Sequence, residues 1–166
     1  METQRKKVII VSLMALLLVW ATLSFASSDT YDAMKGVDSV NVIFDMRDGN
    51  PQSAVIHLNL ILDTYKDLVA MKKKPVFVVV FMGSAVKLIS SDQNGFSAED
   101  QKSLKEIAGI VSRMSETGIR TEVCLFAAKV FGVEPASILP KFERIENGWI
   151  SEIGYQARGY SLVPVY

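Results

Sequence analysis

Apolar residues recur along the chain with two different spacings that alternate. Nearly continuous apolar runs at 40–46 and 76–82 are typical of strands that are covered on both faces. Further short strands are predicted at 119–125, 142–145 and 160–165. Apolar residues at helical spacing separate these runs. The alternation predicts one α/β domain in three layers, with a mostly parallel five-stranded sheet between helices.

The chain's only cysteine, Cys124, lies where a predicted strand gives way to a predicted helix. Gly118 is expected to end the preceding helix in a left-handed conformation. The alternation after it places Arg120, Glu122 and Cys124 on one face of the strand, and Lys129 lies on the next helix. Reactive groups collect at the carboxyl ends of parallel strands, and a helix N-terminus favours a thiolate. Cys124 is therefore the candidate reactive residue.

Three charged residues are candidate supports for this thiol. Arg120 and Glu122 would tune the approach of a charged donor, and Lys129 would favour the thiolate. Their position also predicts that the face around Cys124 is not a dry core. The alternative is a structural cysteine, since free cysteines are among the most buried residues. Burial would raise the pKa of the thiol and make it unreactive. The sequence does not show whether Cys124 is exposed.

Residues 1–26 have the three-part pattern of a secretory signal peptide. Basic residues at 5–7 precede an apolar run at 8–23, and Ser24 and Ala26 are the small residues of a cleavage site. Cleavage predicts a periplasmic or secreted protein. The apolar run also approaches the ~20 residues that span a bilayer. A membrane anchor that leaves the domain outside the cytoplasm is the alternative.

After this segment we expect a flexible lead-in at 27–36 and one domain at 37–166. The 18 basic and 18 acidic residues balance, and no basic patch with interleaved aromatic residues indicates nucleic-acid binding. His57 is the only histidine, which leaves a Cys/His metal site short of ligands. No glycine pattern of a dinucleotide or phosphate loop occurs, so no cofactor is expected.

Four segments carry a resemblance to a known family. They are Val42–Pro51, Val78–Gly83, Gly118–Cys124 and Ile145–Tyr160. By their order and spacing, the chain from Val37 to Tyr166 resembles the DsrE/DsrF-like family of small sulfur-relay proteins. The resemblance implies a three-layer fold, a homotrimer or homohexamer, and a cysteine at the position of Cys124 that carries persulfide sulfur between partner proteins.

Two departures from the family leave the substrate open. Met82 stands where a histidine often precedes the glycine, and the expected signal peptide places the protein away from cytoplasmic sulfur-relay partners. One hypothesis is a periplasmic sulfur carrier, similar to a sulfurtransferase, with Cys124 as the persulfide carrier. The other is a non-enzymatic oligomeric binding module in which Cys124 is structural. Thiol reactivity separates the two.

Overall fold

The computed structural model describes residues 31–166. The predicted signal peptide and the first residues of the predicted lead-in lie outside these described residues. A short 3-10 helix, η1 (Asp32–Met34), comes first, and Gly36–Tyr166 forms one compact unit. Within residues 31–166, no helix has both the length and the apolar character needed to cross a membrane.

The compact unit is built on a five-stranded sheet in the order β4-β3-β2-β1-β5. Its strands are β1 (Ser39–Met46), β2 (Lys74–Phe81), β3 (Arg120–Cys124), β4 (Glu143–Ile145) and β5 (Ser161–Val165). Every neighbouring pair is parallel. The predicted mostly parallel sheet is therefore confirmed and is fully parallel.

The central strands bury their apolar runs, as their sequences predict. Ile43 and Met46 of β1 and Val80 and Phe81 of β2 have no exposed surface. The edge strand β5 differs, because four of its five residues are exposed. Pro164 lies on this edge strand, where its lack of a backbone N–H is tolerated.

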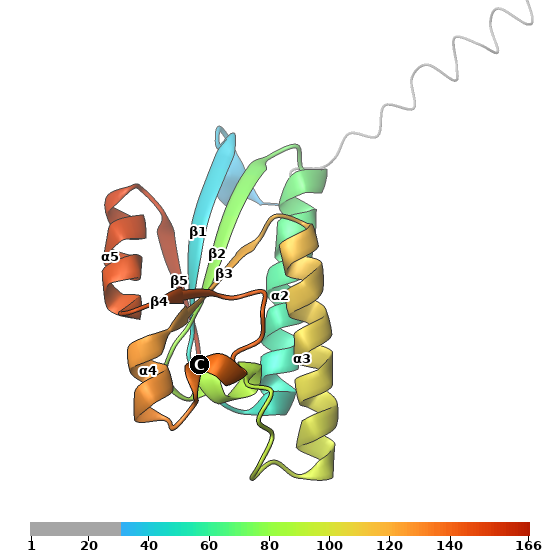
Figure 1. Cartoon of the computed structure of the whole chain (residues 1–166). Coiled ribbons are helices and arrows are strands. Elements are labelled where there is room, and N and C mark those ends of the chain that lie inside the picture. Colours follow the sequence, from blue (N-terminus) through green and yellow to red (C-terminus); the bar gives the residue numbers. More distant parts are fainter. Residues whose placement is uncertain (1–30) are drawn as a thin grey trace, which may run out of the picture. The chain divides into compact units, whose positions relative to one another are not determined.

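Helices cover both faces of the sheet (Figure 1). Two long helices, α2 (Pro51–Ala70) and α3 (Ala98–Glu116), pack together on one face. Two shorter helices, α4 (Leu125–Val130) and α5 (Gly148–Ala157), lie on the other face. The α3 helix begins with a capping box, in which the side chains of Ser97 and Asp100 each accept the other residue's backbone N–H.

The remaining elements are short and join the layers. They are the 3-10 helices η2 (Gly83–Ile89) and η3 (Pro135–Ser137). Gly118 has φ of 86° between α3 and β3, which confirms the predicted left-handed helix end. The strands end on one edge of the sheet, and Cys124 is the last residue of β3 on this edge.

Candidate functional site

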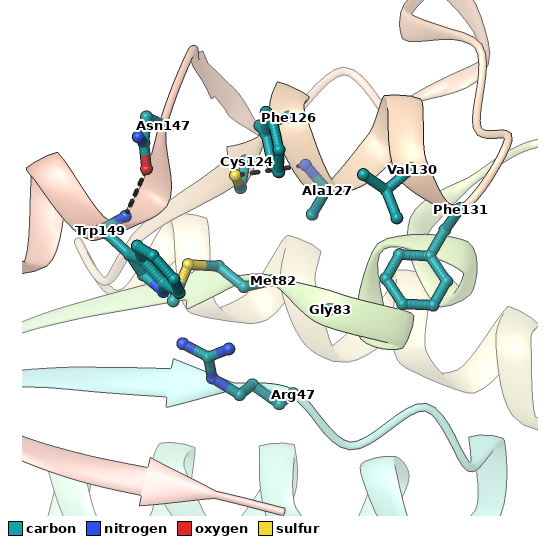
Figure 2. A pocket seen from close by; sticks show the side chains of 10 residues that line it. All are labelled: Arg47, Met82, Gly83, Cys124, Phe126, Ala127, Val130, Phe131, Asn147 and Trp149. Atoms are coloured by element: carbon teal, nitrogen blue, oxygen red, sulfur yellow. Dashed lines mark hydrogen bonds between the residues drawn. The ribbon is translucent and has the colours of Figure 1, made fainter.

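Cys124 joins β3 to α4 and caps the helix. Its Sγ accepts the backbone N–H of Ala127 at 3.4 Å, within the first turn of α4 (Figure 2). It also accepts the N–H of Gly148, the first residue of α5, at 3.2 Å. Two helix N-termini thus present N–H groups to a single sulfur atom. Such donors stabilise negative charge on sulfur better than a neutral thiol.

Gly148 is the residue that allows α5 to start so close to the thiol. A Cβ at this position would overlap the Sδ of Met82 and lie 3.2 Å from the Cβ of Cys124. The preceding residue, Asn147, caps α5 by accepting the N–H of Trp149 at 3.0 Å. The Asn-Gly pair therefore begins the helix and brings its first N–H to the sulfur.

Cys124 is only 4% exposed, but it lines a pocket of about 250 Å³. The other lining residues are Arg47, Met82, Gly83, Phe126, Ala127, Val130, Phe131, Asn147 and Trp149 (Figure 2). Most of these side chains are apolar, and Arg47 is the only charged one among them. The thiol is thus covered from bulk solvent and borders a small, mostly apolar space.

Arg47 belongs to a group of three charged residues beside the pocket. Its Nε donates to Asp45 Oδ2 at 2.6 Å, and Glu152 of α5 lies near both. Burial, followed by the charge of Asp45, raises the pKa of Glu152 to about 7, although Arg47 opposes this rise. Asp45 Oδ1 and Glu152 Oε1 are buried and have no hydrogen-bond partner among residues 31–166 unless Glu152 is protonated, when the two carboxyl groups can share that proton; this hydrogen bond adds to the rise in the pKa of Glu152.

Glu122 lies under α5 and not in the pocket. Its carboxylate accepts hydrogen bonds from Ser151 Oγ and, at 2.8 Å, from Tyr155 Oη, and it pairs with Arg120 Nε at 3.0 Å. Burial, followed by the hydrogen bond to Glu122, raises the pKa of Tyr155 to about 12. The prediction of a half-covered face is therefore wrong at Glu122, whose side chain is 2% exposed, because α5 covers it.

Neither Arg120 nor Lys129 lines the pocket of Cys124. Arg120 is bound between Glu122 and Glu143 on the sheet. Lys129 lies in the last turn of α4. It borders a second pocket, which Glu134 and Glu146 also line. Of the four site residues predicted from the sequence, only Cys124 is in the pocket. Glu122 acts on it indirectly, by holding α5.

His57 takes part in a local cap and does not line the pocket of Cys124. Its Nδ1 lies 3.0 Å from Oδ2 of the buried Asp48, which also accepts the backbone N–H of Asn50 at 2.9 Å. Within the part of the chain that the structure describes, no cluster of three His, Cys, Asp or Glu side chains could hold a metal ion.

Reasoning from the sequence missed most of the pocket. Arg47 follows an apolar strand and looks like part of a polar turn, and Gly148 looks like an ordinary helix start after Asn147. The available signal was Asp45 and Arg47 together at the end of an otherwise apolar strand. Charged residues at that position lie on the edge where the carboxyl ends of the strands meet.

Comparisons with known proteins agree with this fold. Residues 40–164 match the sequence profile of the DsrE/DsrF-like family. An uncharacterized protein of Aquifex aeolicus (strain VF5) is 23% identical over 126 residues, which are 75% of this chain and 56% of that protein. The chain therefore spans little more than half the length of this relative.

The chain is similar to two solved structures. MTH1491 from Methanobacterium thermoautotrophicum, a protein of unknown function, superposes with a TM-score of 0.55 and 18% identity over 77% of this chain and 99% of its own. The ychN protein from E. coli gives 0.49 and 10% identity over 78% of this chain and 99% of its own. The first of these likenesses supports the α/β fold.

Proposed function

Because the chain belongs to the DsrE/DsrF-like family, which is associated with sulfur relay, we propose that it carries sulfane sulfur as a persulfide on Cys124. The observation that carries the proposal is the pair of backbone N–H groups, from Ala127 and Gly148, that face its Sγ. These donors stabilise a thiolate, which is the nucleophile in sulfur exchange.

The exchange balances without an outside oxidant. The Cys124 thiolate attacks the sulfane sulfur of a donor, a new S–S bond forms, and the donor's S–S bond breaks with its electron pair leaving on the donor fragment. In the return step, an acceptor thiolate attacks the outer sulfur and Cys124 leaves as a thiolate. The acceptor would be a partner protein that presents its own thiol at the pocket.

Assembly and location complete the proposal. Large apolar side chains of α4 and α5 are exposed: Phe126, Val130 and Trp149 line the pocket, and Ile150 and Ile153 lie further along α5. This surface supports a homo-oligomer, with a trimer or hexamer expected.

The N-terminal pattern supports export to the periplasm, with a retained anchor as the alternative. Light scattering of the mature form tests the oligomeric state. N-terminal sequencing tests export, and Ser27 is expected as the first residue.

A structural Cys124 is the second candidate, favoured by its 4% exposure. In that case the protein is an oligomeric binding module without sulfur chemistry. Intact mass after incubation with polysulfide decides between them. We expect the wild type to gain the mass of one sulfur atom, removable by reductant, and a folded Cys124→Ser variant to gain none. A thiol that reacts only after denaturation contradicts the carrier function.

A further inference from the structure

Arg47 is placed to present an unused cationic edge to the pocket. It directly follows β1, and its backbone N–H donates to Val165 O at 2.9 Å, which fixes it at the edge where the strands end. Its Nε is taken by Asp45, while its two Nη nitrogens donate to no acceptor among residues 31–166. In Figure 2 the guanidinium points toward Trp149 and Met82, on the pocket wall.

The chemistry of the pocket differs between its two ends. At one end Cys124 meets two N–H donors and apolar neighbours such as Phe126 and Val130. At the other end Arg47 supplies the only charge of the lining. A volume of about 250 Å³ is below the roughly 300–1,000 Å³ of sites for drug-sized ligands. A small molecule with a soft sulfur atom at one end and a negative charge at the other complements this pocket.

Asp45 and Glu152 set the net charge of the group that contains Arg47. Asp45 and Arg47 form an ion pair, so the group of three is neutral when Glu152 is protonated and has one negative charge when Glu152 is ionised. Tyr166, which follows β5, is the other titratable residue near Arg47. Burial, followed by the charge of Asp45, raises the pKa of Glu152 to about 7, so the neutral group predominates at mildly acidic pH.

We propose that Arg47 selects anionic sulfane-sulfur donors for Cys124, with Asp45 and Glu152 as the residues that position the guanidinium and set the charge around it. This inference rests on the proposed function and names its substrate class. A donor with an oxyanion group would place that group against the Nη edge of Arg47, which suits planar, two-pronged recognition of oxyanions. Its sulfane sulfur would then face Cys124.

Arg47 in this position would also stabilise the leaving group of the donor. When the Cys124 thiolate takes the outer sulfur of a thiosulfonate or thiosulfate, the S–S bond of the donor breaks and its electron pair leaves on a sulfinate or on sulfite. Negative charge therefore grows on the sulfur that bears the oxyanion group. A fixed cation beside that position stabilises the developing charge.

A matched series of methanethiosulfonates tests the selectivity. The sulfonatoethyl reagent is anionic, the methyl reagent is neutral and the trimethylammonioethyl reagent is cationic, and all three attach their group to the same thiolate and release methanesulfinate. Ratios of their rate constants therefore cancel the ionised fraction of Cys124. We expect Arg47→Gln to lower the anionic-to-neutral ratio about 10-fold, the loss of one charge-assisted contact. Arg47→Lys should lower the anionic-to-neutral ratio by less than Arg47→Gln does.

The control is Arg113→Gln, the same charge change on α3, which lies on the other face of the sheet. Its ratio should stay within about twofold of the wild type, since exposed charges at a distance are screened. The cationic reagent should respond to Arg47→Gln in the opposite direction. Equal effects of Arg47→Gln on all three reagents, or no effect, would overturn the selectivity while leaving the carrier function intact.

A pH series gives a second readout that a purely structural role would not change. In the wild type, the anionic-to-neutral ratio should fall as the pH rises from 6 to 8, because Glu152 ionises with a pKa of about 7. In Glu152→Gln the ratio should be flat over this range. A ratio that is independent of pH in the wild type contradicts the role of Glu152. If native Cys124 reacts with none of the reagents, the carrier function and the selectivity both fail.

Discussion

The α5 helix meets the sheet at two clusters of buried carboxyl groups whose surroundings are opposite in kind. On β3, Glu122 receives bonds from Ser151 and Tyr155 and pairs with Arg120. Near β1, Asp45 and Glu152 each keep a buried oxygen that has no partner among residues 31–166 unless a proton on Glu152 joins the two carboxyl groups. A fully partnered buried carboxylate stabilises one arrangement of the helix. A partly partnered pair is costly and is typical of sites with a function.

Burial alone therefore does not identify a charged residue with a function. Glu122 is as buried as any charged residue in the domain, yet its partners satisfy it and it has no contact with the pocket. The group of Asp45, Arg47 and Glu152 combines a carboxyl pair whose hydrogen bonding depends on the protonation of Glu152 with a cation on the pocket wall. We therefore assign a structural role to the first cluster and a role in substrate selection to the second.

The largest expected effect is on the Glu122 cluster. Glu122→Ala would leave Arg120, Ser151 and Tyr155 without their shared acceptor under α5, which should lower the free energy of unfolding by about 3 kcal/mol. Urea denaturation followed by circular dichroism measures this loss. Glu143→Ala is the matched control, because Glu143 also pairs with Arg120 but is exposed, and it should cost less than about 1 kcal/mol. Equal losses in the two variants would remove the distinction.

The second prediction concerns pH and the Asp45–Glu152 pair. Glu152 has a pKa of about 7 in the folded protein against an ordinary value of 4.5, so the folded state holds the extra proton between these values. Stability should therefore fall as the pH rises from about 5 to 8. Relative to Glu152→Gln, the wild type should lose on the order of 2 kcal/mol over this range. Thermal unfolding of both proteins at each pH measures the difference, and parallel curves would contradict it.

The smallest expected effect on stability tests the helix start that both clusters position. Gly148→Ala would place a Cβ against Met82 and Cys124, so α5 or Met82 must shift, at a cost of about 1 kcal/mol, because the overlapped atoms belong to the flexible Met82 side chain. Cys124 should then lose the Gly148 N–H and react several-fold more slowly with the neutral methanethiosulfonate at a fixed pH. The matched control is Gly154→Ala on the same helix, where a Cβ meets nothing within 4 Å.

Gly154→Ala should leave the rate of Cys124 unchanged. It should also stabilise the helix by up to about 1 kcal/mol, because alanine has the higher helix propensity. If both variants label at the wild-type rate, the N–H of Gly148 does not act on the sulfur. In that case the α4 N–H of Ala127 would be the only donor that matters for Cys124.

Local sequence patterns were sufficient to predict the elements, their order and the place of Cys124 between a strand and a helix. These features follow from local spacing, since apolar periodicity and end signals such as Gly118 and the Ser97–Asp100 box act within one or two turns. The place of Cys124 at the end of a strand made it a candidate for the same reason. Arg120, Glu122 and Lys129 were candidates only through nearness in sequence.

The side chains that meet at the thiol could be identified only from the packing of the elements. Arg47, Met82 and Gly148 are far apart in sequence and come together because β1, β2 and β3 are parallel and end on one edge, against which α5 begins. The same packing turned Glu122 from a candidate surface charge into a buried anchor of α5. Periodicity reports which face of an element is apolar. It carries no information on which distant side chain fills the space above that face, because strand register and helix docking set that contact.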